Sequence, residues 1–315
     1  MRLEAEPAGD PRPSIPHPRS LLFVPGSRRQ WLVKALASAA DGLVLDLEDA
    51  VPPGEKAAAR ESVGEFIAAH GSEKPLLTRI NDLSSAQALA DLQAVVRPGL
   101  TGVMVPKIVS PSEVELVDRL LTWLEQDRGM PAGSTVIIPV LETAMALRRA
   151  YDIGAASPRT AYMGAACGKG GDMERAIGYR WTPGGMESLA YRSRALIDIR
   201  ASGAQHPMLG VWTSVDDLDG LRAFAGQVRD LGYEGMVAIH PKQVPVINEV
   251  FSLSAEDVGY YQGLIDAMTA AESEGRAAAT YRGQMVDIAM ARTARERLAR
   301  SSAEPRSSAE LREGS

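Results

Sequence analysis

Charged side chains stand directly after several short apolar runs of this chain. Those at the ends of the second, third and fourth runs are Asp46, Glu48, Asp49, Arg79 and Lys107. Carboxylates at such positions bind metals or move protons, and cations there hold anionic groups of a substrate. A strand that only fills a core needs no charge at its end. The repetition therefore indicates a polar site where the ends of several strands meet.

Two later carboxylates are candidate metal ligands. Glu142 closes the run VIIPVLE, where burial of a carboxylate is costly unless a cation or hydrogen bonds compensate it. Asp172 is the next carboxylate at the end of a strand, after a glycine-rich loop. Two carboxylates completed by water suit Mg²⁺, and we predict that Glu142 and Asp172 bind it. The alternative for Glu142 is a carboxylate stabilised by the dipole of a following helix.

The two cations also have structural alternatives. Arg79 can hold a carboxylate or a thioester oxygen, or it can form an internal salt bridge with one of the carboxylates at positions 46, 48 and 49; both roles can hold at once. Lys107 can be a Schiff-base lysine or the partner of a structural ion pair. We prefer the ion pair, because the neighbouring carboxylates indicate metal chemistry.

The elements that must position these residues are eight apolar runs separated by amphipathic stretches. The runs are Leu21–Pro25, Gly42–Leu47, Pro75–Ile80, Gly102–Lys107, Thr135–Leu141, Thr160–Gly164, Met208–Trp212 and Met236–His240. Strands that alternate with helices indicate parallel pairing, and eight such units favour a (β/α)8 TIM barrel over an open sheet. No GxGxxG follows the first run, and GKGG at 168–171 is too short for a P-loop.

The chain divides into four predicted parts. Residues 1–18 contain five prolines, and residues 299–315 lack apolar periodicity, so we expect both tails to be disordered. Residues 19–250 form the barrel. Residues 251–298 are expected to add a C-terminal helical lid of two helices with a Gly/Ala-rich break and no strand.

Composition excludes several classes of protein. The 315 residues carry a net charge of −6 with 5% aromatic residues, which argues against a nucleic-acid binder. Cys167 is the single cysteine, which excludes an internal disulfide. The apolar runs are far shorter than the ~20 residues that span a bilayer, and the charged, Pro-rich N-terminus does not resemble a secretory signal. We therefore expect a soluble, cytoplasmic protein with no membrane partner.

A set of motifs in a fixed order identifies a resemblance. The segments are RSLLFVPGSRRQWLVKA (19–35), GLVLDLEDAVPPGEKAAAR (42–60), TRIN (78–81), VPKI (105–108), IPVLETA (138–144), GDMERAIGYRWTPGGMESLAYRSR (171–194), DDLDGLRA (216–223), GMVAIHPKQVPVINEVF (235–251) and GQMVDIA (283–289). Together they resemble the citrate lyase β-subunit-like group of the HpcH/HpaI aldolase superfamily, which includes malyl-CoA and citramalyl-CoA lyases.

The resemblance implies roles for individual residues. It assigns Glu142 and Asp172 to magnesium and Arg79 to the acyl oxygen or carboxylate of the substrate, which Glu142 also helps to bind. Asp287 matches a catalytic carboxylate that relatives deliver on a C-terminal lid to the neighbouring subunit. From its sequence context alone, Asp287 would be a helix N-cap.

The resemblance also implies a coenzyme A site. Phe23, Arg28 and Lys34 match positions where relatives contact CoA, and cations there suit its phosphates. The alternative for Arg28 and Lys34 is solvated helix charge. The chain departs from the family pattern in a longer loop at 164–172, and Ala176 and Leu209 stand where relatives often carry Asp.

These inferences lead to one predicted activity with stated alternatives. The resemblance implies a magnesium-dependent CoA ester lyase that joins or separates an acyl-CoA enolate and a 2-oxo acid, with thioester hydrolysis as a further activity. The alternatives are a CoA-independent pyruvate aldolase and a barrel that binds a CoA ester without catalysis. A lid shared between subunits implies a homo-oligomer, a trimer or a multiple of it.

Overall fold

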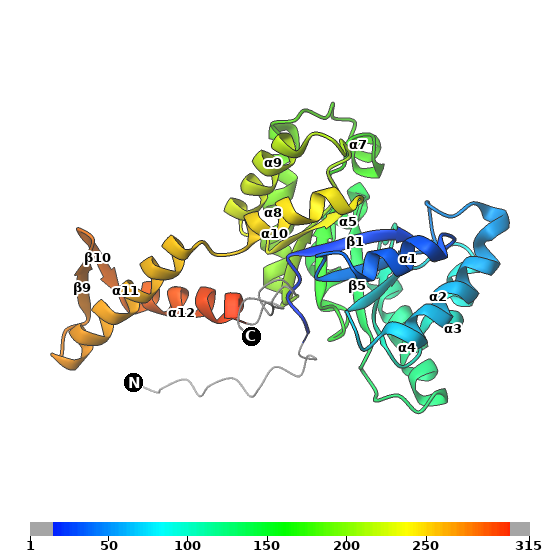
Figure 1. Cartoon of the computed structure of the whole chain (residues 1–315), viewed down its shortest axis with the longest axis horizontal. Helices are drawn as coiled ribbons and strands as arrows, with labels where there is room; N and C mark the ends of the chain where they lie inside the picture. Colours follow the sequence, from blue (N-terminus) through cyan, green and yellow to red (C-terminus); the bar gives the residue numbers. More distant parts are fainter. Residues whose placement is uncertain (1–14, 303–315) are drawn as a thin grey trace.

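The computed structural model describes residues 15–302, and every structural statement below refers to that part of the chain. Eight parallel strands form a closed barrel in which each strand pairs with the next and the eighth pairs with the first (Figure 1). The strands are β1 (Ser20–Pro25), β2 (Gly42–Asp46), β3 (Leu76–Arg79), β4 (Leu100–Val105), β5 (Val136–Leu141), β6 (Tyr162–Ala165), β7 (His206–Leu209) and β8 (Gly235–Ala238). The predicted TIM barrel is confirmed.

Helices connect the strands and cover the outside of the barrel (Figure 1). They are α1 (Arg29–Leu36), α2 (Lys56–His70), α3 (Gln87–Val95), α4 (Pro111–Asp127), α5 (Ala144–Arg148), α6 (Ala150–Ala155), α7 (Asp172–Ile177), α8 (Met186–Ser202), α9 (Leu218–Leu231) and α10 (Val244–Phe251), with short 3-10 turns at Pro53–Glu55 and Pro241–Gln243. In the described part of the chain, no helix combines the length and the apolar character needed to cross a bilayer.

Alternation along the strands separates two cores. Side chains at every second position face the barrel interior, and those between them pack under the helices. In β5, Val136 and Ile138 belong to the interior cluster, whereas Ile137 and Leu141 belong to the outer cluster. The same period of two directs Glu142, the residue after β5, to the inside at the carboxyl end of the barrel.

The opposite end of the barrel is covered by the residues that precede β1. Ile15 is buried in the interior cluster, and the hydroxyl of Tyr162 in β6 donates to the carbonyl of Pro16 at 2.7 Å. Residues 15–18 are therefore packed, although the sequence places them in a disordered tail. Burial of Ile15 at the mouth of the barrel accounts for this difference. The rest of that predicted tail, 1–14, and residues 303–315 of the other lie outside the described residues.

A separate arm follows the barrel and extends away from it (Figure 1). It consists of α11 (Ala255–Ser273), β9 (Ala278–Tyr281), β10 (Gln284–Asp287) and α12 (Ile288–Ser302). The prediction that no strand occurs in this region is wrong, because β9 and β10 pair as an antiparallel hairpin. Its turn places Arg282 and Gly283 at φ values of 48° and 78°, as a type I′ turn requires. The sequence signals for a hairpin are weak here, because β9 begins with two alanines and the turn is Arg-Gly rather than Asn-Gly.

Candidate active site

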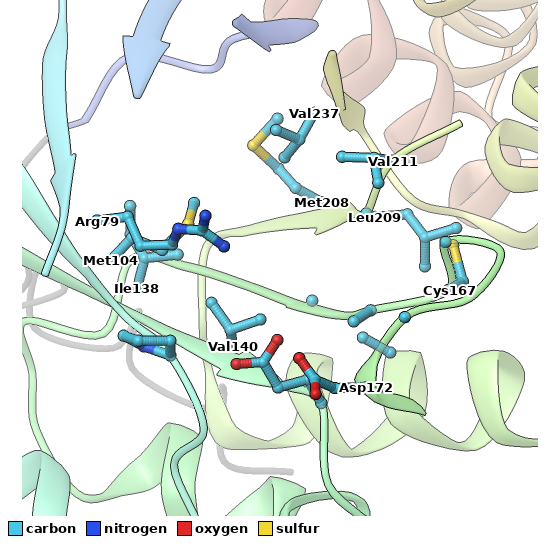
Figure 2. Close-up of a pocket in the computed structure, with 18 of the residues that line it drawn as sticks. Arg79, Met104, Ile138, Val140, Cys167, Asp172, Met208, Leu209, Val211 and Val237 are labelled. Atoms are coloured by element: carbon cyan, nitrogen blue, oxygen red, sulfur yellow. The ribbon is translucent and has the colours of Figure 1, made fainter. Parts of the chain in front are cut away.

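The site lies at the carboxyl ends of the barrel strands, around a cavity of about 220 Å³. Phe23, Arg79, Glu142 and Asp172 all line it. Figure 2 shows Arg79 and Asp172 at this cavity, with the apolar side chains of Met208 and Val237 across it from Asp172. The wall is mostly apolar and its few polar groups converge, which is typical of a site for a small ligand.

Arg79 ends β3 and forms a two-pronged ion pair with the end of β2. Its Nε and Nη2 donate to the two carboxylate oxygens of Asp46, each at 2.7 Å, and its Nη1 lies 3.2 Å from Glu48. The guanidinium also stacks over the ring of Phe23 at 4.7 Å. Burial alone would lower the pKa of Arg79, but the bonds to Asp46 outweigh it and raise the pKa, so the cation persists. The internal salt bridge thus exists, and it fixes the guanidinium at the cavity.

Lys107 follows β4 with an unusual backbone conformation. Its φ is 53°, a left-handed value, and its N–H donates to Glu142 Oε1 at 2.6 Å. Its ammonium group bonds to Glu48 and lies 3.5 Å from Asp49. Burial would lower the pKa of Lys107, but the bond to Glu48 and the adjacent negative charges raise it. A Schiff-base lysine needs the opposite shift, so the geometry agrees with the structural ion pair.

The negative charge of the buried Glu142 carboxylate is only partly compensated by nearby positive charge and hydrogen bonds. Burial raises its pKa to about 7, and the charges of Asp172 and Glu48 act in the same direction. The N–H of Lys107 and the charge of Arg79 oppose this rise without cancelling it. Oxygen donors whose charges repel one another are the donor set that a hard divalent cation requires. The residues present therefore fit Mg²⁺.

Asp172 reaches the cavity as the first residue of α7, after the glycine-rich loop. It forms an ion pair with Arg175 one turn later. The loop is held to the same helix, because the N–H groups of Gly170 and Trp181 donate to Glu174 at 2.6 and 3.0 Å. Its lysine, at position 169, stacks over the Trp181 ring at 5.7 Å. The longer loop is thus a defined wall of the cavity.

Of the two substituted positions in the family pattern, one lies at the cavity and the other does not. Leu209 lines the cavity and makes this part of the wall apolar, whereas Ala176 is exposed on α7 and does not line it. Cys167 also lines the cavity, a position that the sequence did not indicate. Burial raises its pKa to about 12, so it remains a thiol rather than a nucleophilic thiolate. The period of two along β6 groups Cys167 with Met163 and Ala165 in the cluster under the helices, so this pattern does not place it at the cavity.

The remaining predicted residues lie apart from the cavity. Arg28 and Lys34 are exposed at the two ends of α1, and neither takes part in an ion pair with another described residue. Asp287 ends β10 on the arm and accepts a hydrogen bond from the N–H of Met290 at 2.9 Å, as an N-cap does. The structure therefore brings together Phe23, Arg79 and the two predicted metal ligands, but not the other three residues.

Comparisons with known proteins agree with this architecture. The model of the family described as HpcH/HpaI aldolase/citrate lyase matches residues 19–241. The citrate lyase subunit beta-like protein of Deinococcus radiodurans is 37% identical over 284 residues, which cover 88% of this chain and 95% of that protein. The L-malyl-CoA/beta-methylmalyl-CoA lyase of Cereibacter sphaeroides is 36% identical over 303 residues, which cover 89% of this chain and 92% of that protein.

Solved structures show the same likeness. The crystal structure of the protein CitE from Mycobacterium tuberculosis was determined in complex with magnesium, acetoacetate and coenzyme A. It matches this chain with a TM-score of 0.71 at 29% sequence identity, and the match covers 91% of this chain and 98% of that one.

Proposed function

Because the chain belongs to the HpcH/HpaI aldolase/citrate lyase family, and is a carbon–carbon lyase with magnesium as its cofactor, we propose that its substrates are an acyl-CoA thioester and a small 2-oxo acid. The reaction would join the enolate of the acyl-CoA to the 2-oxo acid, or separate the two. The observation that carries this proposal is the convergence of Arg79, Glu142 and Asp172 on one small cavity.

Glu142 and Asp172 are the residues that would hold the magnesium ion. When bound, the ion supplies a positive charge that stabilises developing negative charge on a substrate oxygen. Lys107 holds Glu142 in place through its backbone N–H, so the carboxylate is oriented before any ligand arrives. Preorganised charge of this kind acts without a reorganisation cost during the reaction.

Arg79 would stabilise the enolate oxygen of the acyl-CoA. Asp46 fixes two of its donors, so the guanidinium cannot rotate away from the cavity. Phe23 beneath the guanidinium restricts it further and keeps that side of the cavity apolar. A fixed cation in an apolar wall stabilises an oxyanion more strongly than a solvated one.

Asp287 would move the proton between the acyl-CoA and solvent. It lies on the arm and not at the cavity of its own chain, which supports a role at the cavity of a neighbouring copy. A site completed by a second copy requires a homo-oligomer, and we propose a trimer or a multiple of it.

Phe23, Arg28 and Lys34 would bind the coenzyme A part of the substrate. Both cations are exposed, and neither is neutralised by an ion pair with a described residue. They lie on or beside α1, which follows the strand that carries Phe23. Phe23 at the cavity and two exposed cations outside it suit a long ligand with phosphates at its far end.

The test is turnover of a panel of CoA esters, followed by mass spectrometry. The panel contains (S)-malyl-CoA, β-methylmalyl-CoA, citramalyl-CoA and 3-hydroxy-3-methylglutaryl-CoA, each with Mg²⁺ and with EDTA. We expect metal-dependent release of a shorter acyl-CoA and a 2-oxo acid, and loss of this activity in Asp287→Asn. Asp266→Asn, at an exposed position on the same arm, is the matched control and should retain activity.

Other outcomes distinguish the alternatives. Free CoA with an intact hydroxy diacid identifies a thioesterase. Cleavage of an added free 4-hydroxy-2-oxo acid to pyruvate and an aldehyde, without turnover of any ester, identifies a CoA-independent aldolase. Binding of a CoA ester, without Mg²⁺ binding and without turnover of any substrate, identifies a non-catalytic barrel.

A further inference from the structure

Three side chains converge at the end of the barrel opposite the catalytic cavity. His17 precedes β1, His206 begins β7, and Glu234 directly precedes β8. The two Nδ1 atoms lie 3.1 Å apart, and Oε2 of Glu234 lies 2.9 Å from Nδ1 of His206 and 3.9 Å from Nδ1 of His17. These residues come from three segments that are distant in the sequence.

The protons of this cluster are constrained by the backbone. Nε2 of His206 lies 2.9 Å from the carbonyl oxygen of Pro18, and a carbonyl can only accept, so Nε2 carries the hydrogen. In a neutral imidazole, Nδ1 of His206 is then a lone pair. This lone pair faces the carboxylate of Glu234 and the imidazole of His17. Lone pairs and a carboxylate repel one another at these distances, so the arrangement needs either an additional proton or a bound cation between them.

We propose that His17, His206 and Glu234 bind a zinc ion. Zn²⁺ bonds of about 2.0–2.1 Å to nitrogen and oxygen place neighbouring ligand atoms of a tetrahedral site about 3.3 Å apart. The three separations in this cluster, 3.1, 2.9 and 3.9 Å, bracket that spacing. Two imidazoles and a carboxylate are also a ligand set that zinc uses.

The contacts behind the three ligands match those of a metal site. A metal-binding histidine commonly donates its other ring N–H to a backbone carbonyl, as His206 does to Pro18. The second carboxylate oxygen of Glu234 accepts from Arg200 at 2.5 Å, which leaves Oε2 directed at the histidines.

The surroundings leave room for a fourth ligand. A cavity of about 390 Å³ borders the three side chains and is also lined by Tyr233 and by Asp257 of α11. His206 is 2% exposed, whereas the side chain of His17 is 30% exposed, so an ion can enter past His17. A bound ion would attach the segment before β1 to β7 and β8. The cavity beside these ligands shares no lining residue with the catalytic cavity, so the two sites are separate.

The test is zinc binding by protein stripped with a chelator, in the presence of millimolar Mg²⁺ to occupy the oxygen-donor site. Mass spectrometry of the metal content should give one zinc per chain, and the melting temperature should rise with zinc. His17→Asn and Glu234→Gln should each lower the zinc affinity at least about tenfold. His70→Asn, at a histidine that pairs with Glu73 on α2, is the matched control and should bind like the wild type.

Clear results would overturn the proposal. One is that the wild type binds no zinc under these conditions. The other is that His17→Asn binds zinc with unchanged affinity; because His17 is partly exposed, its replacement should not disturb folding. Loss of zinc binding in Glu142→Gln would place the ion in the catalytic cavity instead. Zinc binding does not depend on turnover, so a failure of the lyase assay leaves this result interpretable. Circular dichroism of each variant confirms that it is folded.

Discussion

Arg79 shows how one residue serves both packing and chemistry. It compensates the charge of Asp46, which is 1% exposed at the end of β2, and it keeps one face at the cavity. A buried ion pair is costly to break, because the remaining charge is left without a partner. The ion pair between Arg79 and Asp46 therefore stabilises the carboxyl end of the barrel and also orients the guanidinium toward the cavity.

Replacement of Arg79 by lysine tests this double role. Arg79→Lys keeps the charge but loses the two parallel bonds to Asp46, because an ammonium group cannot form a planar fork. We expect kcat/KM to fall about 10²–10³-fold, the typical loss when one oxyanion donor is removed. Magnesium affinity, measured by calorimetry, should change little. Activity within threefold of the wild type would contradict the proposed role.

The raised pKa of Glu142 predicts how magnesium binding depends on pH. In the metal-free protein this pKa is about 7, so below pH 7 the acid form dominates and Mg²⁺ must displace a proton. The affinity should fall about tenfold per pH unit below 7 and level off above it. Titration calorimetry at pH 6 and pH 8 measures this. Equal affinities at the two values would contradict it, and Glu142→Gln should remove most of the binding at both.

At the scale of elements, the barrel closes tightly between β6 and β7. A Cβ added to Gly164 would lie 1.6 Å from the carbonyl oxygen of Met208 in β7. Only glycine lets the two strands approach this closely, and Gly164 also lines the cavity. The contact thus shapes the site and the barrel together.

Gly164→Ala should therefore destabilise the barrel. The strands must move apart, which we expect to lower the free energy of unfolding by about 1–3 kcal/mol. Urea denaturation measures the change. Gly226→Ala in α9 is the control, because nothing lies within 4 Å of the added Cβ; it should be neutral or slightly stabilising. Equal stability of the two variants would show that β6 and β7 separate without cost.

The arm has a core of its own. α11, the hairpin and α12 bury Leu264, Met268, Val286 and Ala291 among themselves. Met268→Ala should lower the stability of the arm by about 2–5 kcal/mol and leave the barrel unchanged. Hydrogen exchange should accelerate in α11 and α12 but not in β1–β8. Thr269→Ala, at an exposed position on α11, is the control. Acceleration throughout the barrel would show that the two parts unfold together.

At the scale of the whole molecule, the arm extends from the barrel and carries Asp287 away from the cavity of its own chain (Figure 1). A catalytic role for this carboxylate therefore requires another copy of the chain. Large exposed side chains such as Met285 and Ile288 lie on the same part of the arm. Apolar groups beside the carboxylate suit an arm that packs on a neighbour.

Complementation between two inactive variants tests the shared site. Co-expressed Glu142→Gln and Asp287→Asn chains form mixed oligomers in which about one site in four combines an intact barrel with an intact arm. We expect about a quarter of the wild-type activity, although each variant alone is inactive. Mixtures without activity would contradict the exchange of arms, provided that each variant carries a different affinity tag and that purification on both tags in turn shows the oligomers to be mixed.

The sequence by itself determined the barrel and the composition of its polar end. Apolar runs of strand length that alternate with amphipathic stretches allow few other architectures, and a period of two places residues such as Arg79 and Glu142 inside. Arg79 and Glu142 are buried close to each other because the alternation of each strand directs them inward and because the sheet closes into a barrel. The match of the eight predicted runs to β1–β8 reflects this local origin.

Other features were decided by the tertiary structure alone. The β9–β10 hairpin depends on the pairing of Ala279 with Val286 over the arm core, and not on strand propensity. The cluster of His17, His206 and Glu234 joins segments separated by 189 and 28 residues, so no spacing in the sequence reveals it. Local preference acts between neighbours in the chain. The hairpin also needs the packed core of the arm, and the cluster exists only after closure of the barrel brings β7, β8 and the segment before β1 together.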